Sequence, residues 1–185
     1  MDTTSRTMYA LSYGIFTPDD LLKKLRLDGD RLTDDPHPYD IFNFIVTAYV
    51  LAEWIEKFYR ASGKAKNFSV ASRNKEWTIP TISDEWILDT TCVPNVDSGI
   101  KRNIVNCLSI CAYTANASKH FHWKDNGAVA AIGKEPPIND YYQHFFTSTD
   151  KDMYVDFQGQ NYGLKQIRGI LLQFYTGLIL YFEQD

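Results

Sequence analysis

The sequence has few cysteines, no strong excess of one charge and no long uninterrupted apolar run. Its three cysteines are an odd number, which does not favour a closed set of disulfides. Charged side chains interrupt the apolar stretch from Tyr39 to Tyr59, and the stretch from Gly169 to Phe182 is too short to span a bilayer. The first residues lack the charged-then-apolar pattern of a signal peptide. We therefore expect a cytoplasmic protein with no membrane partner.

Charge gives a local rather than a global signal. The net charge of −4 at pH 7 is mild for 185 residues, so it does not by itself indicate a nucleic-acid partner. The segment from Lys57 to Lys75, however, carries basic residues and no acid. It is either a solvated loop or an RNA-contacting stretch in which Phe58, Tyr59 and Phe68 stack on bases. The predicted nucleic-acid-binding residues are Arg60, Lys64, Lys66, Arg73, Lys75 and, further along the chain, Lys119.

Apolar residues at helical spacing predict three substantial helices. They run from Tyr39 to Arg60, from Ile100 to His122 and from Leu164 to Phe182. Shorter helices are expected after the capping residues Thr17 and Ser83, and Asp28-Gly29-Asp30 should end the first of them. Partial alternation of aromatic and β-branched residues predicts strands at 128–132, 141–147 and 153–158, with a hairpin turn at Gly159-Gln160. No element is assigned to residues 61–82.

These elements define the expected fold class. It is mainly α, a bundle of three to five helices in a single domain over residues 1–185, with a small antiparallel β patch between the last two long helices. The first two long helices should pack antiparallel at its centre, with the last helix laid against them. Gly169 and Gly177 weaken that last helix, which indicates close packing against a neighbour.

A polar seam runs along the helix predicted from Ile100 to His122. Steps of three and four residues place its members on one helix face: Arg102, Asn106, Ser109, Tyr113, Asn116 and His120. Such a seam is either an exposed or interfacial face or a polar site between two helices. Asn116 and His120 lie one turn apart, so they are the candidate catalytic pair, with His120 transferring protons near neutral pH. The alternative is a structural histidine that donates to a nearby acceptor.

The segment from Ala115 to Phe121 resembles the end of the signature helix of HEPN-type proteins, small helical bacterial proteins common in toxin and phage-defence systems. The helix from Tyr39 to Trp54 resembles the acid-containing helix that precedes it. The resemblance implies a metal-independent ribonuclease that acts as a homodimer on RNA and uses no cofactor. Asn116 and His120 match the polar residue and the histidine of the signature, whereas Ala115 stands where the family has an arginine. That arginine would stabilise charge on the cleaved phosphate, and Arg168 is a candidate substitute.

The cysteines and remaining histidines give weaker signals. Cys107 and Cys111 lie one helical turn apart, but no second Cys or His pair at a metal-binding spacing joins them. We therefore interpret both as core or near-core residues and predict neither a metal nor a cofactor.

Two classes of function follow from the sequence. The first, which the sequence slightly favours, is a HEPN-like effector that handles or cleaves RNA. The second is a non-catalytic helical module that binds a cognate protein partner and has lost the active-site arginine. Asn116, His120 and the basic segment favour the first, whereas the acidic composition and Ala115 favour the second.

Overall fold

A computed structural model describes residues 14–71, 76–80, 99–120, 129–133 and 153–184, with the backbone alone for 118–120 and 129–133. Its elements, in chain order, are the helices and strands α2 (Pro18–Asp30), α3 (Pro38–Ala61), α5 (Gly99–His120), β1 (Val129–Gly133), β2 (Tyr154–Phe157), β3 (Gln160–Gly163) and α7 (Leu164–Glu183). The predicted fold class is confirmed, because the described part is mainly helical with a small antiparallel sheet between α5 and α7. The helix predicted after Ser83 and the strand predicted at 141–147 lie outside the described residues.

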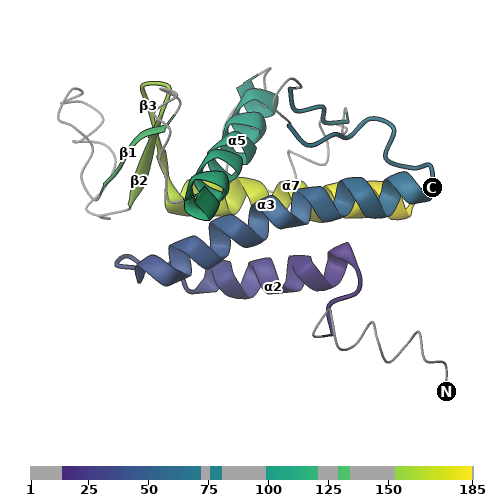
Figure 1. The fold of residues 1–185 in the computed structure, drawn as a ribbon, viewed down its shortest axis with the longest axis horizontal. Coiled ribbons are helices and arrows are strands. Elements are labelled where there is room, and N and C mark those ends of the chain that lie inside the picture. Colours follow the sequence, from purple (N-terminus) through teal and green to yellow (C-terminus); the bar gives the residue numbers. More distant parts are fainter. Residues whose placement is uncertain (1–13, 72–75, 81–98, 121–128, 134–152, 185) are drawn as a thin grey trace.

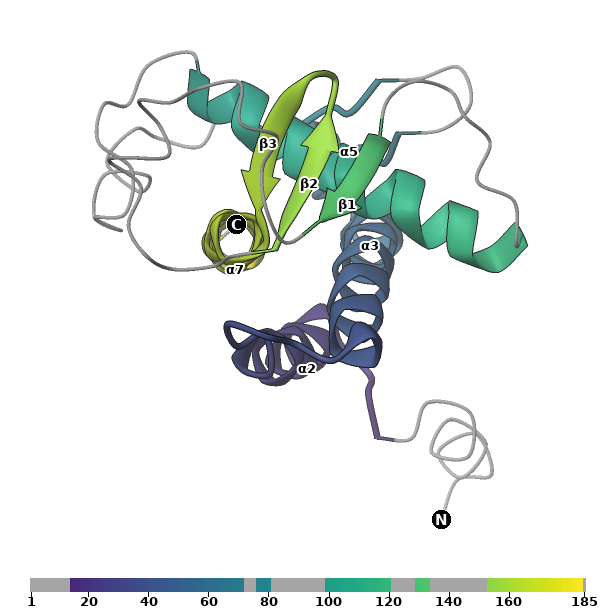
Figure 2. The ribbon, with the colours of Figure 1, turned by 90° about the vertical axis from the view of Figure 1, so that its left-hand side faces the viewer.

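Three helices run roughly along one direction, with α2 against both α3 and α7, and the fourth helix, α5, crosses them on the other side (Figure 1 and Figure 2). In Figure 1, α2, α3 and α7 lie roughly side by side, with α2 running in the opposite direction to the other two. Figure 2 views α3 and α7 almost along their axes, and α5 lies across them. The predicted antiparallel packing of α3 and α5 is therefore wrong, although both helices contribute to one hydrophobic core as expected. None of the helices in the described ranges is long and apolar enough to cross a bilayer.

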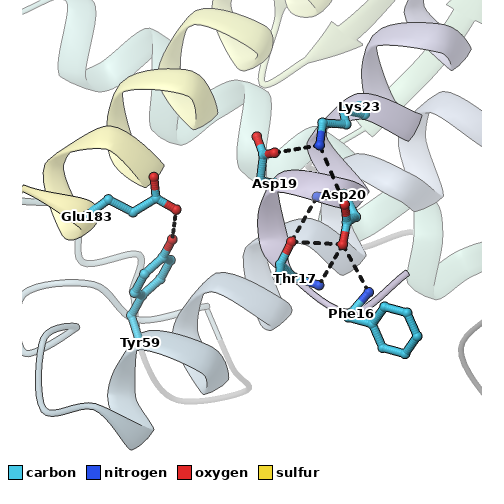
Figure 3. Close-up of polar contacts among 7 residues, drawn as sticks. All are labelled: Phe16, Thr17, Asp19, Asp20, Lys23, Tyr59 and Glu183. Carbon is cyan, nitrogen blue, oxygen red and sulfur yellow. Dashed lines mark hydrogen bonds and ion pairs between the residues drawn. The ribbon is translucent and has the colours of Figure 1, made fainter. Parts of the chain in front are cut away.

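The start of α2 follows from its local sequence. Thr17 is the N-cap, and its hydroxyl accepts a hydrogen bond from the backbone N–H of Asp20 at 3.2 Å. The Asp20 carboxylate reaches back to accept from the backbone N–H groups of Phe16 and Thr17, each at 3.2 Å (Figure 3). This reciprocal pair satisfies amides that the first turn leaves without helical partners, and Pro18 lacks such an amide altogether. The predicted capping role of Thr17 is confirmed.

The end of α2 differs from the prediction because tertiary contacts override local propensity. The helix continues through Asp28 and Gly29 to Asp30. The buried Asp28 carboxylate accepts hydrogen bonds from Lys24 at 2.5 Å and from the Thr47 hydroxyl on α3 at 2.7 Å. A Cβ at Gly29 would lie 3.1 Å from the guanidinium of Arg168, so glycine admits this side chain from α7. These contacts hold the last turn in helical geometry.

The capping box gives a first prediction. Thr17→Ala should lower the free energy of unfolding by about 1 kcal/mol, because one amide of the first turn loses its acceptor. Thr33→Ala is the matched control, since Thr33 lies exposed in the loop after α2. Urea denaturation of both variants, followed by circular dichroism, measures the difference. Equal stability of the two variants would contradict a capping role.

The same cap predicts a pH dependence. The pKa of Asp20 lies below its usual value, first because of the hydrogen bond from the Thr17 hydroxyl and then because of the backbone N–H of Phe16. A carboxyl whose folded pKa is depressed stabilises the fold above its unfolded pKa of about 3.9, and the contribution is lost as pH falls through the folded value. In Asp20→Asn, the free energy of unfolding, measured by urea denaturation at a series of pH values, should therefore fall less steeply than in wild type as the pH drops below about 5. Above about pH 5 its pH dependence should change little.

The core joins α7 to α3 through aromatic side chains. The buried Tyr175 hydroxyl donates to the carbonyl of Ala48 in the middle of α3 at 2.7 Å. Near the ends of the two helices the rings of Tyr59 and Phe182 stack at 4.9 Å, and the Tyr59 hydroxyl donates to Glu183 at 3.2 Å (Figure 3). Burial raises the pKa of Tyr59, and the charge of Glu183 raises it further. Of the two glycines predicted to be closely packed, Gly177 is buried, whereas a Cβ at Gly169 would meet nothing within 4 Å.

The sheet has the strand order β1-β2-β3 with antiparallel pairing throughout. The hairpin between β2 and β3 turns at Gln158 and Gly159, whose φ angles are 55° and 76°. Positive φ at both central residues is the geometry of the two-residue turn that matches strand twist, and the Asp156 carboxylate accepts from the Gly159 amide at 3.1 Å. The strands predicted at 128–132 and 153–158 are confirmed. The turn lies one residue earlier than predicted, and β3 was not predicted.

Candidate functional site

Polar side chains from α3 and α5 meet where the two helices cross. The Glu53 carboxylate from the same helix and the Asn116 side chain from α5 both lie near enough to the Tyr49 phenol to shift its pKa. Tyr49 and Glu53 lie one turn apart, which places them on the same face of α3. We call these three residues the α3–α5 junction. Tyr49 is buried, Glu53 is half-buried and Asn116 is exposed, so the junction opens to solvent.

The junction presents a carboxylate, so it favours ligands that donate hydrogen bonds; we call it an acceptor site. Burial raises the pKa of Tyr49, the negative charge of Glu53 and its hydrogen bond raise it further, and the hydrogen bond with Asn116 opposes the shift. The phenol therefore stays protonated at neutral pH. An ionised carboxylate has about four lone-pair positions, so Glu53 can accept further hydrogen bonds from a ligand. A cationic donor would meet favourable charge here, and a phosphate would meet repulsion.

The predicted catalytic pair lies on the last two turns of α5. Asn116 is exposed and belongs to the junction, and His120 is the final residue of the helix. Because α5 is helical from Asn116 to His120, the two backbone positions share a helix face as predicted. The side chains of Lys119 and His120 lie outside the described residues.

The polar side chains along α5 contact two different neighbours, the sheet and α3. Towards the start of the helix, the Asn106 amide donates to the Tyr162 hydroxyl of β3 at 2.6 Å, and the ring of Tyr113 lies 6.2 Å from that of Phe157 in β2. Towards its end, Asn116 reaches Tyr49 on α3. Among its described side chains, the seam is therefore interfacial at Asn106 and Asn116, and it contributes Asn116 to a polar site between helices at the α3–α5 junction.

Ala115, which the proposed resemblance aligns with the arginine of the HEPN-type signature, is fully buried. Cys111 and Leu108, one and two turns earlier on α5, are also buried in the same hydrophobic core. An arginine at this position would place a guanidinium among apolar side chains rather than beside Asn116 and His120. Arg168, the candidate substitute, forms an ion pair with Asp30 at 2.5 Å between α7 and α2.

The basic segment is partly built into the fold. Arg60 forms an ion pair with Glu56 on the same helix, and Lys64 donates to the backbone carbonyl of Phe182 near the end of α7 at 2.9 Å. Lys66 is exposed, whereas Arg73 and Lys75 lie outside the described residues. The contribution of Arg60 to an RNA surface is reduced because Glu56 offsets its charge, whereas Lys64 keeps its charge but is held against the end of α7.

Two of the three aromatic residues proposed to stack on bases belong to the core. Tyr59 stacks on Phe182, and Phe68 is 1% exposed and packs near Phe174 with the ring centroids 6.4 Å apart. The prediction that they stack on bases is therefore wrong for Tyr59 and Phe68. Phe58 is 48% exposed, so its ring remains accessible for stacking on a base.

The described cysteines are inert. Cys107 and Cys111 are buried, as predicted, and burial raises the pKa of Cys107 to about 12 and raises that of Cys111 as well. A thiol held protonated in this way is neither a nucleophile nor a metal ligand at neutral pH. Within the described ranges, no three His, Cys, Asp or Glu side chains gather closely enough to hold a metal ion.

Sequence reasoning missed Tyr49 and Glu53. Their spacing of four residues places them on one face of α3, but no local pattern indicates that this face meets α5. Only the crossing of α3 over α5 brings them to Asn116. Comparisons with family models, curated proteins and solved structures find no match for this chain.

Proposed function

We propose that this chain is a non-catalytic helical module that binds a cognate protein partner, related to the HEPN-type scaffold by the resemblance of α5. The observation that carries the proposal is the α3–α5 junction. There the Tyr49 phenol lies beside both Glu53 and Asn116, and the residue preceding Asn116 is buried in the core. A ribonuclease needs positive charge at this place to stabilise the phosphate.

Exposed aromatic side chains support the same proposal. Tyr39 is 73% exposed and Phe42 is 48% exposed, both near the start of α3. Aromatic residues are enriched in protein interfaces because they bury a large area at a small entropic cost. A partner that covers this part of α3 would remove both side chains from water. In a toxin or phage-defence system, that partner would be the effector or regulator that acts with this protein.

A nuclease assay on His120→Ala tests the proposal against catalysis. We expect the wild-type chain to leave both structured RNA and a single-stranded oligonucleotide intact. The variant should then differ from wild type only in stability. If a buried acceptor loses its donor, the free energy of unfolding should fall by about 1–3 kcal/mol and the melting temperature should fall with it. Lys66→Glu should leave RNA affinity at low salt unchanged. Cleavage that His120→Ala abolishes without altering the melting temperature would establish the ribonuclease instead, with an expected loss of about 10²–10⁴ in rate.

A further inference from the structure

We draw no further inference here: the strongest candidate, the partly uncovered side of α3 that carries the exposed Tyr39 and Phe42, rests on the exposure of these side chains alone, because nothing in the described ranges of the chain shows what covers it.

Discussion

Ala115→Arg should destabilise the protein severely instead of creating a ribonuclease. The side chain at this position is fully buried among apolar residues of α5. Arginine would overpack the core and bury a charge that has no partner there, so we expect a loss of at least about 3 kcal/mol in the free energy of unfolding. The measurement is the urea midpoint by circular dichroism, together with RNA cleavage on the same preparation.

Ala61→Arg provides the matched control for this substitution. Ala61 is the last residue of α3 and is exposed, so the same change there should alter stability by less than about 0.5 kcal/mol. If Ala115→Arg were as stable as Ala61→Arg, the position would not belong to the core. If it also cleaved RNA, the missing arginine would be the only reason for inactivity, and the proposed function would be wrong.

Phe68→Ala should cost about 3–5 kcal/mol, because a fully buried aromatic ring leaves a cavity beside Phe174. Phe58→Ala removes the same side chain from an exposed position in the same basic segment and should cost less than about 1 kcal/mol. Thermal or urea denaturation separates the two effects.

RNA binding at low salt distinguishes core packing from base stacking for the same pair of variants. In the structural interpretation neither substitution changes RNA affinity, provided that the Phe68→Ala chain is still folded under the assay conditions. A loss of affinity in Phe58→Ala with unchanged stability would show that the exposed ring contacts bases. Such a result would count against the protein-binding function.

The sequence predicted the helices well and their arrangement poorly. The span of α3 followed from apolar residues at helical spacing, and the start of α2 followed from a capping box that is local in the chain. The crossing of α3 and α5 depends on how side-chain ridges of two distant segments fit together, which no local pattern encodes. The end of α2 was misplaced because Lys24 and Thr47 hold Asp28, and β3 was missed because its residues are mostly polar and its pairing depends on the hairpin turn.

The same limit applies to the candidate site. Helical spacing was enough to place Asn116 and His120 on one face of α5 and Cys111 in the core. It could not identify what faces Asn116 across the helix crossing, which turns out to be Tyr49 with Glu53. The sequence predicted a proton-transferring histidine as the partner of Asn116, whereas the described neighbour of Asn116 is a tyrosine beside a carboxylate.

Hydrogen bonds among the half-buried Lys24 and the buried Asp28 and Thr47 fix the register of α2 along α3. The Lys24 ammonium also donates to the Thr47 hydroxyl at 2.7 Å, so three polar groups close a ring between the helices. A purely apolar interface would tolerate a slide of one helical turn, about 5.4 Å, with little loss. Here the same slide would leave the buried Asp28 carboxylate among apolar side chains without its hydrogen-bond partners. These hydrogen bonds thus disfavour structures in which α2 is shifted along α3. In the observed register, Asp30 forms an ion pair with Arg168 on α7. Asp34 forms another with Lys165.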